Sequence, residues 1–257
     1  MKENLGIQLF SVRDYIKTYE EADKTLKALK DFGYGQAQTA GCAFGYDKLG
    51  ELVEKYGIEV VGTHFNEFEE IYNDFDGVAE KTRLLGATNI GVGACMFASL
   101  DAVNDFIIKA NEVAKKAAAI GMKFTYHNHS HEFGKWENGK TTMEMLTEGL
   151  DKENITFCFD TYWVQHAGGD VCAWIEKLAG RIDIIHLKDM MVDNLKSWKN
   201  NPAITEVGSG NMDWQRIINS ARKAGVKYYI VEQDINWNPD CISAARKSYE
   251  YLRNKID

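Results

Sequence analysis

The stretch Tyr126-His127-Asn128-His129-Ser130-His131-Glu132 carries three of the chain's six histidines within five residues. It continues an apolar run, residues 122–126, whose length and composition predict a buried strand. Three later apolar runs also end in a residue type that binds metals: Asp160 follows 155–159, His186 follows 182–185, and Glu232 follows 228–231. One ligand-type side chain at the end of each of four successive strands predicts a shared site at one end of a parallel sheet.

Short apolar runs alternate with longer segments of helical periodicity along the whole chain. The expected strands are the four above and residues 5–10, 35–39, 59–63 and 89–92. The expected helices are 20–32, 47–56, 71–85, 100–119, one capped by Thr141, 171–178, one starting near Met212, and 241–252. Eight strand–helix pairs in about 250 residues predict an α/β fold of the (β/α)8 TIM-barrel class, with one domain over residues 1–257. An open doubly wound sheet would require a phosphate-binding glycine loop, which the sequence lacks.

The bulk composition limits the class of partner. The chain has 257 residues, 45% hydrophobic and 26% charged, with a net charge of −8. Acidic charge disfavours a nucleic-acid partner, because phosphate binding depends on Lys and Arg. No apolar run approaches the roughly 20 residues of a membrane span, and the N-terminus does not resemble a signal peptide. The five scattered cysteines are typical of reduced thiols, so we expect a cytoplasmic protein.

The four strand ends predict one divalent metal site. Its expected ligands are His127, Asp160, His186 and Glu232. Two imidazoles and two carboxylates suit Mn²⁺, Co²⁺, Zn²⁺ or Fe²⁺ better than Ca²⁺. Such a cation would act as a Lewis acid toward a sugar carbonyl and acidify the neighbouring proton.

Further side chains are expected around this metal. His129 lies on the same strand face as His127, as a substrate contact, an alternative ligand or a supporting residue. Lys188 shares a face with His186 and would stabilise an oxyanion, act as a base, or form a salt bridge to Asp160 or Glu232. His64 ends its strand and would bind substrate or line the rim. The aromatic residues expected to wall a sugar pocket, with plain packing as the alternative, are Phe10, Trp136, Trp163 and Trp237.

Four motifs carry a resemblance over essentially the whole chain: FDTYW at 159–163, IHLKD at 185–189, EVGSGNMDW at 206–214 and VEQD at 231–234. They resemble the xylose isomerase-like superfamily of TIM barrels, which includes sugar phosphate isomerases, epimerases and inosose dehydratases. The resemblance implies one divalent metal held by Glu, Asp, His and Glu at the ends of strands five to eight. Asp160, His186 and Glu232 match this set, whereas His127 replaces the first glutamate.

This replacement departs from the two glutamates that exchange protons in the epimerases. The Tyr-His-x-His run of strand five fits dehydratase-like members better. Two other departures are Trp163, where a histidine is frequent, and Gln38, where strand two often ends in glutamate.

We therefore expect a metal-dependent sugar isomerase or epimerase that works by enolisation next to the carbonyl of a free or phosphorylated sugar, polyol or keto-sugar, with a non-phosphorylated substrate favoured. Glu232 is the expected base, and His129 or Lys188 the second proton carrier. The first alternative is a lyase or dehydratase acting on a keto-sugar or keto-inositol. A non-catalytic sugar-binding barrel is the second, and a DNA-repair nuclease is disfavoured by the acidic charge. Association into a homo-oligomer stays open.

Overall fold

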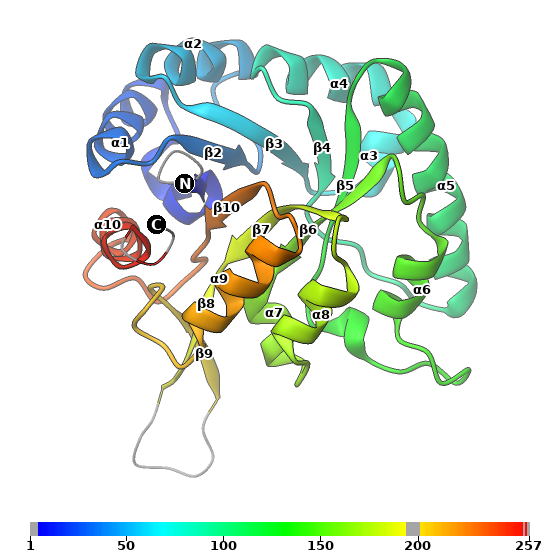
Figure 1. The fold of residues 1–257 in the computed structure, drawn as a ribbon. Helices are drawn as coiled ribbons and strands as arrows, with labels where there is room; N and C mark the ends of the chain where they lie inside the picture. The colour runs from blue at the N-terminus through cyan, green and yellow to red at the C-terminus, as the bar shows by residue number, and fades with distance from the viewer. Residues whose placement is uncertain (1–4, 194–200, 254, 256–257) are drawn as a thin grey trace.

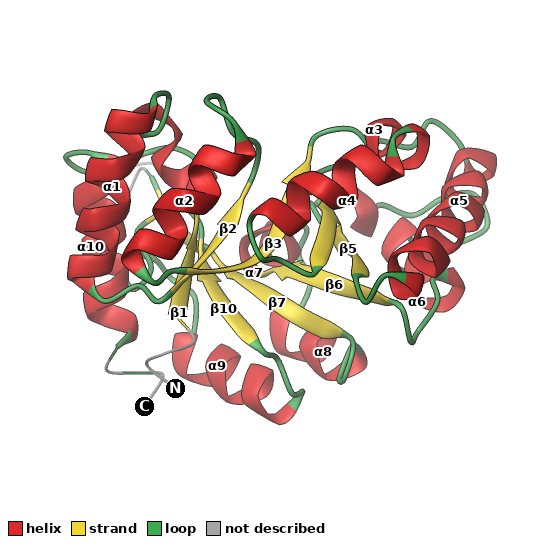
Figure 2. Cartoon of the chain, turned by 90° about the horizontal axis from the view of Figure 1, so that it is seen from above, coloured by secondary structure: helices red, strands yellow, loops and turns green. Residues whose placement is uncertain are grey.

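The computed structural model describes residues 5–193, 201–253 and 255. Eight parallel strands close into a barrel in the order β1-β10-β7-β6-β5-β4-β3-β2, and the helices lie outside them (Figures 1 and 2). The strands are β1 (Leu5–Gln8), β2 (Gln36–Thr39), β3 (Glu59–Phe65), β4 (Asn89–Val92), β5 (Lys123–His127), β6 (Ile155–Asp160), β7 (Ile182–Leu187) and β10 (Tyr228–Val231). The predicted (β/α)8 class is confirmed, while the outer limits of the expected domain lie outside the described residues.

The helices follow the expected alternation with strands. They are α1 (Tyr19–Phe32), α2 (Tyr46–Tyr56), α3 (Phe68–Asn73), α4 (Phe75–Leu84), α5 (Leu100–Ala119), α6 (Thr142–Gly149), α7 (Thr161–His166), α8 (Val171–Lys177), α9 (Trp214–Lys223) and α10 (Cys241–Leu252). Thr141 forms the predicted capping box with Glu144. The single helix expected over 71–85 is wrong, because Asp74 ends α3 and then caps α4 through the backbone N–H of Gly77.

Three further differences occur at strand ends that face the barrel mouth. The first strand stops at Gln8, and a 3₁₀ helix (Leu9–Tyr15) follows. Helix α7 begins directly after Asp160, whose carboxylate caps it by accepting from the backbone N–H of Trp163. After β7 the chain forms an antiparallel hairpin of β8 (Asp189–Val192) and β9 (Pro202–Thr205), which projects from the barrel (Figure 1). Neither α7 nor this hairpin is among the elements expected from the sequence.

Apolar side chains fill the barrel and the layer between barrel and helices. Val61, Cys158, Ile184 and Ile230 form a separate buried cluster. Since β3 and β7 are not neighbours in the sheet, this contact crosses the barrel interior. The larger core packs the outer strand faces against the helices. A few buried polar side chains also lie in this layer, such as Thr63 and Thr82, whose hydroxyl oxygens are 3.1 Å apart.

Candidate metal centre

Four ligand-type side chains converge at the carboxyl ends of the strands. His127 ends β5, Asp160 ends β6, His186 lies on β7, and Glu232 follows β10. All four are buried, and each offers one ligand atom within 4.8 Å of those of the others. The structure thus brings together the four residues that the strand ends predicted. Their convergence follows from the parallel register, in which Asp160 pairs with His186.

Hydrogen bonds on the far side of each imidazole orient the ring nitrogens. Nδ1 of His127 lies 2.8 Å from the carbonyl oxygen of Gly93, which can only accept. Nδ1 therefore carries the proton, and the Nε2 lone pair faces Oδ2 of Asp160 at 3.4 Å. On His186, Nε2 donates to Oε1 of Gln38 at 2.6 Å, so Nδ1 is the atom left to face Glu232. Metal-binding histidines are typically held in this way.

The donor set fits a divalent cation. Nδ1 of His186 lies 2.9 Å from Oε2 of Glu232, yet within the described part of the chain this ring nitrogen has no hydrogen bond of acceptable geometry, whereas Oε2 of Glu232 is paired with Nζ of Lys188 at 2.8 Å. Buried polar atoms without partners are rare and call for an explanation such as an ion. Two nitrogen and two carboxylate oxygen donors suit the borderline first-row metals.

Lys188 places an ammonium group beside this cluster. Its Nζ lies 3.2 Å from Asp160, 2.8 Å from Glu232 and 2.9 Å from Asp234, and the side chain is 1% exposed. Burial opposes the charged form, but the surrounding carboxylates outweigh burial and hold the pKa of Lys188 well above its usual value. Lys188 therefore stays protonated, which favours stabilisation of an oxyanion over the role of a base. The expected salt bridges to Asp160 and Glu232 are present.

Glu232 is ionised in this environment. Burial alone would raise the pKa of its carboxyl group, but Lys188 and His186 lower it well below the usual value. Asp234, two residues later, has a raised pKa because it is buried next to the Glu232 carboxylate. The charge of one lysine is thus shared among three acidic side chains, and a bound cation would balance the remaining negative charge.

The loop after β5 places His129 at the rim of the cluster. Its ring centroid lies 4.7 Å from that of His127 and 5.3 Å from that of Trp163. Burial, and then the neighbouring His127, lower the pKa of His129 to about 3, so the ring is neutral. Glu132 fixes the loop by accepting from the backbone N–H of His129 at 2.9 Å and from the Tyr126 hydroxyl at 2.8 Å.

A cavity of about 220 Å³ opens above the cluster. Phe10, His64, His129, Lys188 and Glu232 line it together with Ala40, Asn66, Gly93, Ala94, His127 and Asp234. Trp163 is not among the described residues that line the cavity, but its ring lies 5.4 Å from Nζ of Lys188 and 5.3 Å from the ring of His129, which both do.

Two expected aromatic residues lie elsewhere. Trp136 and Trp237 are not among the described residues that line this cavity. The indole N–H of Trp136 donates to the hydroxyl of Thr142 at 2.8 Å, and that of Trp237 donates to the carbonyl of Gln233 at 3.0 Å. Both rings are half-buried, and the guanidinium carbon of Arg13 lies 5.0 Å from the ring of Trp237.

Sequence reasoning missed the polar residues that support the site. Gln38 is fully buried and bridges two histidines, with Oε1 on His186 and Nε2 2.8 Å from Nε2 of His64. Asn128 accepts from the backbone N–H of Asp160 at 2.9 Å. Asp234 could have been found from its two-residue spacing after Glu232. Gln38 was noticed only as a departure from a family pattern.

Comparisons with known proteins agree with this fold. Residues 19–255 match the family model described as xylose isomerase-like TIM barrel, so the chain belongs to this family. An inosose dehydratase of Mesomycoplasma hyopneumoniae is 26% identical over 201 residues, covering 69% of this chain and 65% of that protein. The chain thus matches slightly less than two thirds of the length of this relative.

Solved structures show the same barrel. A sugar phosphate isomerase/epimerase from Parabacteroides distasonis superposes with a TM-score of 0.81 at 20% identity, covering 97% of this chain and 93% of that one. An IolI protein with a bound zinc atom superposes with a TM-score of 0.73 at 14% identity over 98% of both chains. Among the described residues, none of the helices is long and apolar enough to cross a membrane.

Proposed function

We propose that this protein is a divalent-metal-dependent enzyme that abstracts the proton next to a carbonyl of a sugar or keto-sugar. The observation that carries this proposal is the buried group of His127, Asp160, His186 and Glu232, in contact with a protonated lysine below an open cavity. A cation bound there would supply a Lewis acid for the substrate carbonyl. The zinc bound by the structurally similar IolI protein supports a divalent metal in this fold.

The chain's own residues divide the remaining work. Glu232 lines the cavity as an ionised carboxylate and would take the proton from the carbon next to the carbonyl. The electron pair of the broken C–H bond then forms a C=C bond, and the carbonyl oxygen becomes an oxyanion. The Lys188 ammonium lies 2.8 Å from Glu232 and would stabilise this negative charge. His129, neutral and with a buried unpartnered Nδ1 in the described structure, would form a hydrogen bond with a substrate hydroxyl group, and Glu232 would return the proton that it took.

Isomerisation or epimerisation results when the proton returns to carbon. A second outcome, β-elimination, is favoured by two observations. His127 stands where the epimerases carry a second glutamate, and the matched relatives are named inosose dehydratase. In that outcome the enolate re-forms the C=O bond, a C=C bond forms between the α and β carbons, and the β-hydroxyl group leaves as water with the proton that Glu232 took from the substrate.

The experiment combines metal analysis with deuterium uptake from D₂O into a panel of keto-sugars and inososes. We expect one divalent metal per chain and exchange at one carbon, with about 10²-fold or greater loss of exchange in Asp160→Asn and Glu232→Gln. Asp183→Asn is the matched control, because Asp183 is a buried, ion-paired carboxylate at the opposite end of β7. A protein with neither metal nor exchange would instead be a sugar-binding barrel.

Water loss separates the two outcomes. An enone product from an inosose, detected by its ultraviolet absorbance, would identify the elimination, whereas an isomeric ketose or epimer would identify the first reaction.

A further inference from the structure

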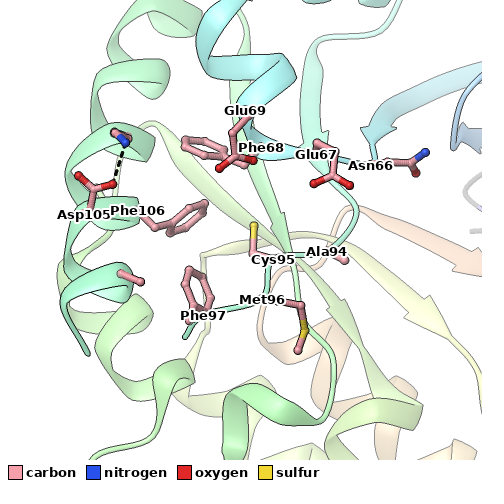
Figure 3. A pocket seen from close by; sticks show the side chains of 12 residues that line it. Asn66, Glu67, Phe68, Glu69, Ala94, Cys95, Met96, Phe97, Asp105 and Phe106 are labelled. Atoms are coloured by element: carbon pink, nitrogen blue, oxygen red, sulfur yellow. Dashed lines mark ion pairs between the residues drawn. The ribbon is translucent and has the colours of Figure 1, made fainter. Parts of the chain in front are cut away.

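A second, larger cavity lies beside the candidate metal centre. It measures about 530 Å³ and is formed by the loops after β3 and β4 with the first turns of α3 and α5 (Figure 3). Its lining residues are Asn66, Glu67, Phe68, Glu69, Ala94, Cys95, Met96, Phe97, Ala102, Asp105, Phe106 and Lys109. We call this cavity the β3–β4 groove. The proton chemistry proposed above uses none of its side chains.

The groove adjoins the cavity above the metal centre. Asn66 and Ala94 line both cavities. Asn66 directly follows β3, the strand that carries His64. Ala94 follows β4 and Gly93, whose carbonyl oxygen accepts the hydrogen bond from His127. A ligand that reached from the first cavity past Asn66 and Ala94 would enter the groove.

The floor of the groove is aromatic. Phe68 and Phe106 are buried with ring centroids 4.6 Å apart, and Phe97 packs against Phe106 at 5.3 Å (Figure 3). Met96 stands at the rim and is 79% exposed. An exposed methionine beside such rings provides an adaptable apolar surface. The half-buried ring of Phe97 and the exposed thioether of Met96 offer a polarizable contact for a flat apolar group.

The charges around the groove disfavour an anion. Glu67, Glu69 and Asp105 line it against one cation, Lys109. Nζ of Lys109 already pairs with Asp105 at 2.7 Å, so the two glutamates remain in excess. A phosphate or carboxylate in the groove would meet uncompensated negative charge.

We infer that the β3–β4 groove binds an apolar, uncharged substituent carried by the sugar that occupies the metal centre. The substrate is then a glycoside-like keto-sugar with an aromatic or similarly apolar group, rather than a free monosaccharide. This inference rests on the proposed function, because it assumes a sugar at the metal centre. It adds the larger part of the binding site, 530 against 220 Å³.

The test measures binding by calorimetry, which does not require turnover. The probes are methyl, phenyl and 4-carboxyphenyl β-glucosides oxidised to the ketone at C2, C3 or C4. For at least one ketone position the phenyl derivative should bind about tenfold more tightly than the methyl derivative, because its ring leaves water. The carboxyphenyl derivative should lose that gain.

Variants locate the effect. Phe97→Ala should abolish the preference for phenyl over methyl, while Ile108→Ala, which removes an exposed apolar side chain of α5 outside the groove lining, should keep it. Glu67→Lys changes an exposed residue and should tighten binding of the carboxyphenyl derivative about tenfold. Glu80→Lys on the outer helix α4 is its control.

The outcomes separate the two proposals. Deuterium exchange into methyl keto-glucosides without any phenyl preference would overturn the groove assignment and leave the proposed function intact. A phenyl preference that Phe97→Ala abolishes, in a protein without exchange, would support the groove and contradict the proposed enolisation. Equal affinities of all three derivatives for wild type and variants would overturn the inference.

Discussion

Gln38 is a buried amide that links two histidines of different strands. Its Oε1 accepts from Nε2 of His186, and its Nε2 lies within hydrogen-bond distance of Nε2 of His64. The amide thereby keeps Nδ1 of His186 directed at Glu232. A glutamate at this position would add a fifth buried charge to a site that already holds Asp160, Glu232, Asp234 and Lys188, so the neutral amide limits the charge that a cation must balance.

We predict that Gln38→Leu lowers divalent-metal affinity about 10- to 100-fold, the usual effect of losing the hydrogen bond behind a metal-binding histidine. Competition against a chromogenic chelator would measure it. Gln36→Leu is the matched control, since Gln36 is a buried amide two residues earlier that binds Glu59 at the other end of the barrel. Equal affinities of Gln38→Leu and wild type would show that the ring orientation does not depend on this amide.

Glu132 gives the histidine loop a pH-dependent stability. Burial raises its pKa, although His131 and the hydrogen bonds from Tyr126 and His129 act in the opposite sense. A carboxyl group with a raised pKa stabilises the fold most below its unfolded value near 4.5, and this contribution is lost as the pH rises through the folded value.

We therefore predict that wild type loses free energy of unfolding relative to Glu132→Gln as the pH rises from about 4.5 toward 8. Urea unfolding of both proteins across this range would measure the difference. If the difference in free energy of unfolding between wild type and Glu132→Gln does not change with pH, Glu132 does not titrate in this range.

At the scale of elements, the hairpin and the loop after it are organised around one carboxylate. Oδ2 of Asp189 accepts from the backbone N–H groups of Gly208 and Gly210 and from the indole N–H of Trp214, at 2.8, 3.1 and 2.7 Å. The glycine at 210 is needed because a Cβ there would lie 2.4 Å from Asp189. The IHLKD and EVGSGNMDW motifs are thus joined through the carboxylate of Asp189, which binds the second motif.

We predict that Asp189→Ala lowers the free energy of unfolding by about 3 kcal/mol, because several charge-assisted hydrogen bonds are lost together. Asp213→Ala should cost about 1 kcal/mol, since it removes only the exposed cap of α9. Chemical denaturation would measure both, and limited proteolysis should cut the Asp189→Ala variant between β8 and α9. A similar loss of free energy of unfolding in the two variants would contradict the proposed structural role of Asp189.

At the scale of the molecule, the two ends of the barrel differ in how their charged side chains are paired. The amino end is closed by Asp183 with Lys123 and Lys227, at 3.3 and 3.0 Å. The carboxyl end gathers the buried histidines and carboxylates, where binding sites of such barrels lie. At the amino end the charge of Asp183 is balanced by lysine side chains. At the carboxyl end the acidic side chains exceed the one lysine, so a bound cation would balance the rest.

We predict that a divalent cation stabilises the whole fold. At a free concentration 100 times its dissociation constant, binding to the native state alone adds about 2.7 kcal/mol, which raises the Tm by several degrees. Differential scanning fluorimetry with Mn²⁺, Co²⁺ and Zn²⁺ against a chelator would detect this. Asp160→Asn should show no rise, whereas an equal rise in wild type and variant would place the cation elsewhere.

The prediction from sequence succeeded where the signal is local. Residues 89–92, 100–119, 228–231 and 241–252 match the observed β4, α5, β10 and α10. The four ligand-type residues were found because each directly follows an apolar run and parallel strands share one orientation. It failed at the hairpin and at α7, where short segments hold their shape through Asp189 and Asp160 rather than through a hydrophobic period.

By itself, the sequence determined the alternation of strands and helices, and hence which ends of the strands meet. Only the tertiary structure decided which side chains reach the site from a distance. Gln38 contacts His186 across 148 residues, and the β3–β4 groove arises where loops after neighbouring strands lie side by side. Trp136 and Trp237 turn into their own loops instead of the cavity. The reason is physical: periodicity records which face of an element is buried, whereas loop side chains take their direction from partners that barrel closure brings near.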